Sequence, residues 1–266
     1  LYIKGIKYNL SGVERGNIKS KGNFYKHKNK YFSIFKKDIK VLFRNTTFFI
    51  QCVLPAFLLP VIMIIMSVNS SGEIDTIISV ESSILQFFSG ITIIQFFLMM
   101  NYVSATSVSR DGIDEVNCLK SQPLNFLKVI SVKVIPGILL GIINIVISII
   151  FITKNFQFDL YSLITIFIIG FLLNVIQNYL QIMIDLKHPK LYWESEMSVV
   201  KQNINIFYSV LISFTMFIIV SIIAGIFMKY NLKNMDIFII VLLLGLYGII
   251  KVYLKKNANH LYQKLR

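Results

Sequence analysis

Three acidic side chains lie close together in a charged insert between two long apolar runs. They are Asp111, Asp114 and Glu115, within the segment 107–126. Paired carboxylates can act as general acid and base, and acids grouped with histidine can bind a metal ion. These three acids are nearly adjacent in the sequence and have no histidine near them. We therefore expect no catalytic residue, no metal site and no cofactor site in this chain.

The sequence also lacks the short motifs that membrane enzymes and ATPases use. It contains no His-Glu-x-x-His, no Gly-x-Ser-x-Gly and no Gly-rich phosphate loop ending in Gly-Lys. Its two cysteines, Cys52 and Cys118, fall at different levels of the expected fold, so we expect no disulfide. If the protein moves a substrate, the energy must come from another protein.

A stripe of polar side chains follows the fourth apolar run. Spaced at steps of 3, 1, 3 and 4, these residues share an arc of about 100° on one helix face. Amides are costly against lipid, so this face must point into the protein. Two interpretations stay open: the face lines a substrate route or a subunit seam, or it provides hydrogen bonds between helices. The residues are Asn174, Gln177, Asn178, Gln181 and Asp185.

Composition indicates a membrane protein. Of the 266 residues, 55% are hydrophobic and 15% are charged, and the mean hydropathy is +0.68. Six apolar runs approach the ~20 residues that a helix needs to cross ~30 Å of hydrocarbon. Because lipid offers the backbone no hydrogen bonds and no short alternating segments are present, we expect an all-α polytopic bundle. The six predicted spans are 46–68, 83–104, 134–153, 160–184, 206–228 and 235–252.

Charged side chains are missing from the centre of every predicted span. Lys133, Asp185 and Lys251 lie at span ends, where we expect their charged groups to reach the membrane surface. Ion-coupled transporters usually need an ionisable group inside the membrane. This pattern again places the energy source outside the chain.

Basic residues are unevenly distributed over the segments between the predicted spans. Alternate segments hold 24 and 3 of the 27 Lys and Arg residues. Cytoplasmic loops carry the excess of positive charge, so both termini and the segments 105–133 and 185–205 are predicted to be cytoplasmic. This topology accounts for the net charge of +14. Without a basic-aromatic platform, we expect membrane lipids and no nucleic acid among the partners.

The residues before the first span are predicted to form an amphipathic helix at 31–45. Its apolar and basic residues occupy adjoining arcs, as in a helix that lies in the headgroup layer. The alternative is a polybasic flank that only sets the topology. We predict a linker at 1–30, a six-helix transmembrane domain at 46–256 and a cytoplasmic tail at 257–266. The two arcs contain Tyr31, Phe32, Phe35, Ile39, Leu42 and Phe43, and Lys36, Lys37, Lys40 and Arg44.

The insert 107–126 is predicted to form a second short amphipathic helix on the cytoplasmic side. Asp111 can cap its start, and Pro123 ends it. Such a helix is attached to the second and third spans, so a cytosolic protein could push on both through it. Its apolar face consists of Ile113, Val116 and Leu119.

The insert resembles a signature of ABC-type exporter permeases of the type-2 branch. Ser-Arg-Asp-Gly at 109–112, Leu-Lys-Ser-Gln-Pro at 119–123 and Lys133 are similar to Ser-Arg-Glu-Gly, Leu-Lys-x-x-Pro and Lys in that family. There the loop is the coupling helix that docks on the ATP-hydrolysing subunit. Asp111 replaces the usual Glu, which keeps the charge and shortens the reach. The resemblance implies coupling roles for Ser109, Arg110, Asp111, Gly112, Ile113, Val116, Leu119 and Pro123.

The segment 185–205 is similar to a second pattern of the longer permeases in that branch, Asp-x-x-x-Pro-Lys-Leu-x-Trp followed by Lys-x-Asn-x-Asn. We expect Asp185 to pair with one of the nearby lysines, Lys187, Lys190 or Lys201. The loop is expected to contact a cytosolic partner, with an ordinary anchored turn as the alternative. The matching residues are Asp185, Pro189, Lys190, Leu191, Trp193, Lys201, Asn203 and Asn205.

The resemblance covers about residues 31–205 and implies a function. It implies a permease subunit of an ATP-driven exporter in a bacterial-type plasma membrane, with 31–45 as the elbow helix. Its partners would be a cytosolic ABC ATPase that binds ATP and Mg, and a second six-span half or copy. The chain would be the C-terminal six-span half of a longer permease. The alternatives are a polytopic membrane enzyme acting on lipids and a non-catalytic membrane scaffold or immunity protein.

Overall fold

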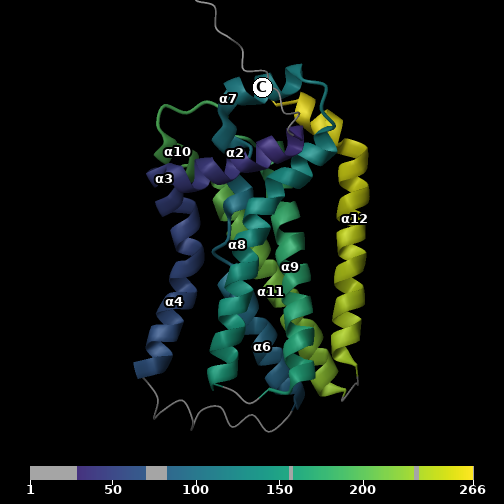
Figure 1. Cartoon of the computed structure of the whole chain (residues 1–266). Helices are drawn as coiled ribbons and strands as arrows, with labels where there is room; N and C mark the ends of the chain where they lie inside the picture. Colours follow the sequence, from purple (N-terminus) through teal and green to yellow (C-terminus); the bar gives the residue numbers. More distant parts are fainter. Residues whose placement is uncertain (1–28, 70–82, 156–157, 231–233, 266) are drawn as a thin grey trace, which may run out of the picture.

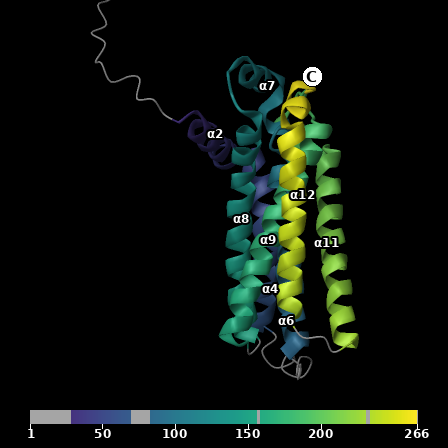
Figure 2. The ribbon, with the colours of Figure 1, turned by 90° about the vertical axis from the view of Figure 1, so that its right-hand side faces the viewer.

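The computed structural model describes residues 29–69, 83–155, 158–230 and 234–265, and within these ranges it is helical without a strand. The long helices run side by side, and one shorter helix, α2 (Lys30–Arg44), lies across their upper ends (Figures 1 and 2). Almost all of the predicted linker 1–30 lies outside the described residues. The chain is thus an all-α bundle, as the composition predicts.

Five stretches in the described ranges are long and apolar enough to cross a membrane, and a sixth counts if a bent pair is one broken span. The bent pair is α2 with the helical stretch Thr46–Ile62, at an angle of 80°. That stretch includes α3 (Thr46–Phe48), a π-helical turn (Phe49–Val53) and part of α4 (Leu54–Asn69). The five are Phe87–Thr106, Phe126–Lys154, Leu160–Lys187, Glu196–Phe227 and Met235–Gln263.

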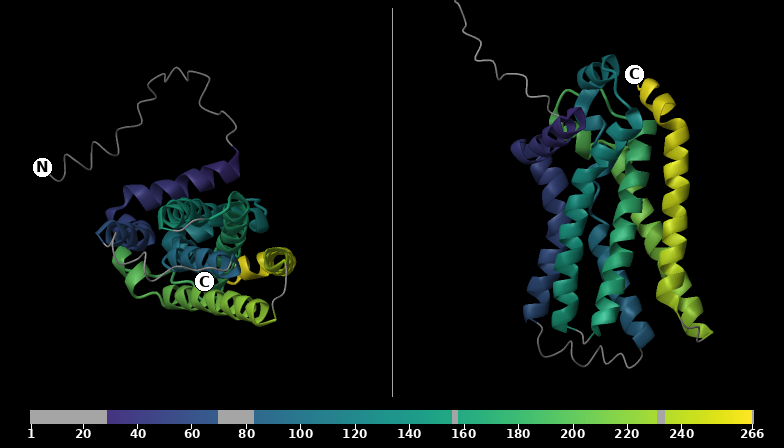
Figure 3. Two further views of the ribbon diagram at one scale, coloured as in Figure 1. Left: turned by 90° about the horizontal axis from the view of Figure 1, so that it is seen from below. Right: turned by 45° about the vertical axis from the view of Figure 1, so that its right-hand side comes forward.

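The helix α9 (Leu160–Lys187) lies in the middle of the bundle and packs against the other long helices. Figure 3 shows α2 on one side of the central helices and α11 on the other. By contrast, α11 and α12 expose many apolar side chains, as expected for helices that face lipid. The remaining long helices are α6 (Ser83–Leu98), α8 (Phe126–Asn155), α11 (Ile204–Lys229) and α12 (Met235–Gln263).

Two glycines let α8 approach α9 closely. A Cβ atom at Gly137 would lie 2.0 Å from Asn178 Oδ1, and one at Gly141 would lie 2.0 Å from Asn174 Oδ1. The pair is one helical turn apart, so both face the same neighbour. The amides of α9 therefore occupy the space that larger residues on α8 would fill.

Three helices differ in extent from the predicted spans. The helix α8 begins at Phe126, eight residues before the predicted span start at 134, and Phe126 stacks on Tyr262 at 4.5 Å between ring centroids. Tyr262 belongs to α12, which stays helical to Gln263 and so includes most of the predicted tail 257–266. The second span, predicted at 83–104, corresponds to the apolar stretch Phe87–Thr106, although α-helical geometry ends at Leu98.

Polar contacts account for the early end of α6. The side chain of Asn101 donates to the carbonyl of Gly137 at 2.8 Å, and its own carbonyl accepts from Gln181 Nε2 at 2.8 Å. These bonds hold a non-helical segment among α6, α8 and α9. A 3₁₀ turn, η2 (Val103–Thr106), follows.

Candidate functional site

The two segments predicted to face the cytosol meet at one end of the bundle. The indole of Trp193 donates to the carbonyl of Ser109 at 3.1 Å, and the Lys190 amide donates to Ser109 Oγ at 3.0 Å. The Ile113 amide donates to the carbonyl of Leu191 at 3.2 Å. The insert and the 185–205 segment therefore form one hydrogen-bonded unit.

Asp185 is the buried centre of this unit. Its carboxylate accepts from the amides of Val108 and Ser109 at 2.6 and 3.1 Å, and from Asn205 Nδ2 at 3.0 Å. The hydroxyl of Ser109 also donates to it. Asp185 thus holds the 3₁₀ turn η3 (Ser109–Asp111) against α9 and α11.

Two expectations for Asp185 are wrong. It does not reach the membrane surface, because its side chain is fully buried. Nor does it pair with a nearby lysine within the described chain: Lys190 Nζ instead donates to the carbonyl of Ser198 at 3.0 Å, and Lys187 Nζ lies over the ring of Tyr253. Four hydrogen bonds take the place of the expected ion pair, as buried carboxylates require.

The predicted helix of the insert is present as α7 (Gly112–Ser121), and it ends before Pro123 as expected. The capping prediction for Asp111 is wrong, since its side chain makes no capping bond. The chain enters α7 through Gly112 with φ 71° and ψ 175°. This backbone region is open essentially only to glycine. The glycine of the signature is therefore explained by the turn itself.

Asp111 belongs to a group of five charged residues that we call the charge cluster: Lys37, Asp38, Asp111, Glu115 and Lys133. Asp111 lies 2.6 Å from Lys37 Nζ and 2.5 Å from Lys133 Nζ. Asp38 lies 3.0 Å from Lys37 Nζ and 3.4 Å from Lys133 Nζ, and Glu115 also pairs with Lys37. The cluster connects α2, α7 and α8.

The prediction that Lys133 reaches the membrane surface is wrong, because Lys133 is buried in the charge cluster. Its side chain is 0% exposed, so it points into the protein and does not extend to the membrane surface. Sequence reasoning also missed the roles of Lys37 and Asp38. The available signal was Asp38 itself, a single acid among the basic residues of α2 that lies between Ile34 and Leu42 on the buried face.

The pKa values of two acids in the cluster shift in opposite directions. Burial alone would raise the pKa of Asp111, but the charges of Lys133 and Lys37 outweigh it and hold the pKa below its usual value. Burial and the negative charge of Asp111 raise the pKa of Glu115. Three acids share two lysines, so Glu115 is the acid whose ionisation is disfavoured.

Most predicted coupling residues are buried inside this end of the bundle. Arg110, for example, donates to the carbonyl of Val103 at 2.8 Å and to Thr106 Oγ1 at 2.6 Å. Ile113 is partly buried and Pro123 is exposed, so few of these side chains can touch another protein. The buried members are Ser109, Arg110, Asp111, Gly112, Val116 and Leu119.

A groove with a volume of about 850 Å³ lies beside the start of α7. It runs between α7 and the 190–202 segment, which includes α10 (Glu196–Lys201). The exposed acids Asp114 and Glu194 line it, together with Tyr192, which is 69% exposed. The residues of the 185–205 segment that were predicted to contact a partner differ in exposure. Leu191 is buried, Pro189, Lys190 and Trp193 are half-buried, and Lys201 is exposed.

The polar face of α9 points inward, as predicted. Asn174 Nδ2 donates to the carbonyl of Ile138 at 3.0 Å, and Ser104 Oγ donates to Asn178 Oδ1 at 2.6 Å. These bonds link α9 to α8 and η2. Among the described residues, Gln177 Nε2 has no hydrogen-bond partner. All four amides, Asn174, Gln177, Asn178 and Gln181, are buried.

The fold places the chain in the class of all-helical proteins with several helices able to cross a membrane, which is consistent with an integral membrane protein. Within the described residues, no group of His, Cys, Asp and Glu could hold a metal ion. No family model, curated protein or solved structure matches the chain.

Proposed function

We propose that the chain is the membrane-spanning permease subunit of an ATP-driven exporter of the ABC type-2 class. Its α7 helix and the 190–202 segment would contact a separate ATP-hydrolysing subunit. One observation carries the proposal: the two segments that resemble the family's signatures are bonded to each other through Ser109 and Asp185, which are 76 residues apart. The resemblance alone did not require this contact.

The hydrogen bonds and ion pairs of this region support a mechanical role. A force on α7 would reach α2 and α8 through the charge cluster. It would reach α9 and α11 through Asp185 and Asn205, which are bonded at 3.0 Å. Buried groups of this kind hold a fixed geometry, since breaking them leaves charges without partners. Movement of the ATP-hydrolysing subunit would therefore shift several spans together.

The groove beside α7 supports the choice of contact surface. Asp114 and Glu194 carry charges that a basic surface could match, and Tyr192 is an exposed aromatic residue of the kind enriched in interfaces. The partner would bind ATP and Mg, and this chain would bind neither. A second six-span half or copy would complete the transport pathway, with export as the direction that the family resemblance implies.

Site-specific crosslinking tests the proposal on the full chain in its native membrane. A photoreactive phenylalanine analogue replaces Tyr192 in the groove or Tyr161, which is 64% exposed at the opposite end of α9. We expect the analogue at 192, and not at 161, to crosslink a polypeptide that also binds a labelled ATP analogue. Equal labelling from both positions, or a partner that does not bind ATP, would contradict the proposal.

A further inference from the structure

The outer face of α2 carries positive charge that no acid balances among the residues that the structure describes. Lys36, Lys40 and Arg44 are exposed, and none forms an ion pair with an acid in the described part of the chain. Their neighbour Lys37 is different, because its charge is used by the acids of the charge cluster. The three free cations are spaced four residues apart, so they form one row along the helix.

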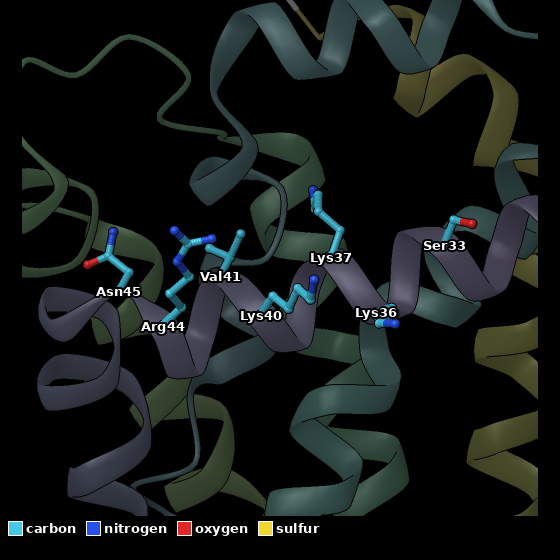
Figure 4. A pocket seen from close by; sticks show the side chains of 7 residues that line it. All are labelled: Ser33, Lys36, Lys37, Lys40, Val41, Arg44 and Asn45. Carbon is cyan, nitrogen blue, oxygen red and sulfur yellow. The ribbon is translucent and has the colours of Figure 1, made fainter. Parts of the chain in front are cut away.

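This row is unfavourable for α2 on its own. Like charges four residues apart destabilise a helix by a few tenths of a kcal/mol per pair, about 0.2–0.5 kcal/mol. A bound anion would remove this repulsion. The row borders a hollow with a volume of about 670 Å³, and Figure 4 shows the side chains that line it. They are Ser33, Lys36, Lys37, Lys40, Val41, Arg44 and Asn45.

Exposed aromatic residues lie next to the row. Phe32 is 56% exposed and Phe43 is 51% exposed. Going around the helix axis in one direction, these two aromatic side chains come first, and Lys36, Lys40 and Arg44 follow in that order. The opposite face of α2, with Ile34 and Leu42, is buried against the bundle. The apolar side chains thus lie where the acyl chains of a phospholipid would begin, and the basic side chains lie beside them, where its phosphate would be.

We propose that this face of α2 binds the headgroup of an anionic phospholipid. Lys36, Lys40 and Arg44 hold its phosphate, and Phe32 and Phe43 contact the start of its acyl chains. The site rests on the proposed function, because the family resemblance behind it makes 31–45 the elbow helix at the membrane surface. The 80° bend between α2 and the next helix places α2 across the ends of the long helices (Figure 1). The site does not depend on an ATP-hydrolysing partner.

Native mass spectrometry of the full chain in detergent tests the site without any partner protein. The chain is titrated with phosphatidylglycerol, with phosphatidylcholine of the same acyl chains, and with phosphatidylglycerol in excess inorganic phosphate. Because the site consists of these three cations, Lys36→Gln/Lys40→Gln/Arg44→Gln should weaken phosphatidylglycerol binding at least about tenfold. Lys36→Arg/Lys40→Arg should bind as the parent does, because it keeps the charge.

A matched control distinguishes a binding site on α2 from attraction of the lipid by the net positive charge of the protein. Lys255, Lys256 and Lys264 are exposed at the same end of the molecule, and their triple change to Gln removes the same charge. We expect it to change phosphatidylglycerol binding less than about twofold, because these lysines lie on α12 and its end, outside the proposed site on α2. An equal loss in both triple variants, equal binding of phosphatidylcholine, or displacement by inorganic phosphate would each overturn the proposal. None of these outcomes bears on the crosslinking test for the ATP-binding partner.

Discussion

Lys133 illustrates, at the scale of single residues, how a lysine at the end of an apolar run can belong to the core. Its ammonium group lies 2.5 Å from Asp111 and 3.4 Å from Asp38, and its side chain is fully buried. A charge in such a place is stable only with its partners. The neighbouring sequence offers no acid, so its partners come from α2 and from the insert.

Replacing Lys133 should therefore destabilise the fold. We expect Lys133→Met to lower the free energy of unfolding by about 3 kcal/mol, the lower end for loss of one partner in a buried ion pair, because Lys37 remains beside both acids. Unfolding in mixed detergent micelles measures the change. Lys154→Met, at an exposed position on the same helix, is the control and should be close to neutral. Equal stability of the two variants would rule out a structural role for the cluster.

Glu115 gives a prediction of opposite sign. Its pKa is raised above the ordinary 4.5, so the folded protein prefers the protonated acid, and stability is lost as the pH rises through the raised pKa. We expect Glu115→Gln to be more stable than the parent at pH 7, with the difference disappearing below about pH 4.5. Thermal unfolding over a pH series measures it, with Glu194→Gln as the exposed control. A less stable Glu115→Gln protein at pH 7 would show that its pair with Lys37 dominates.

At the scale of helices, the contact between α8 and α9 depends on small residues. A Cβ atom at Gly141 would lie 2.0 Å from Asn174 Oδ1, and Asn174 is itself bonded to Ile138. We expect Gly141→Ala to cost about 1–3 kcal/mol, because α8 or the amide must move. Gly248→Ala on α12, where a Cβ atom meets nothing within 4 Å, is the control. Unfolding in mixed micelles measures the stability of both variants. Equal free energies of unfolding would mean that the Asn174 side chain can change its rotamer at no cost.

Patterns within one helix were predictable from the sequence. Apolar length predicted the bundle, amide spacing predicted the inward face of α9, and Pro123 marked the end of α7. Contacts between distant helices were not predictable in this way. Lys133 and Asp38 are 95 residues apart, and Asp185 and Ser109 are 76 residues apart. Helical periodicity predicts which face of a helix is buried, but it does not predict which residue of another helix contacts that face.

On the scale of the whole molecule, the ion pairs of the described residues gather at one end, and the apolar helices extend away from it. The C-terminal end of α12 belongs to this polar end, since Lys120 donates to the carbonyl of Leu265. The groove beside α7 is open at the same end. If a partner docks there, surface charge should decide its affinity while the buried contacts keep the fold.

Charge reversal in the groove tests this division. We expect Asp114→Arg to reduce recovery of the ATP-binding partner about tenfold, or ~1.4 kcal/mol, in addition to a small loss of stability of about 0.3–1 kcal/mol because the acid stands in the first turn of α7. Asp159→Arg, an exposed acid at the opposite end, makes the same change of charge and should leave recovery unaltered. Quantitative co-purification from native membranes provides the measurement. Equal recovery with both variants would place the docking surface elsewhere.

The bonds around Ser109 also set an order of events during synthesis. The amides of Val108 and Ser109 have their acceptor on Asp185, which the ribosome adds 76 residues after Ser109. Asn205, the other donor to that carboxylate, is added later still. A nascent chain that has released Ser109 must therefore wait for two more spans before the turn can close. Until Asp185 is added, the amides of Val108 and Ser109 lack this acceptor, and a chain that terminates before residue 185 would lack it permanently.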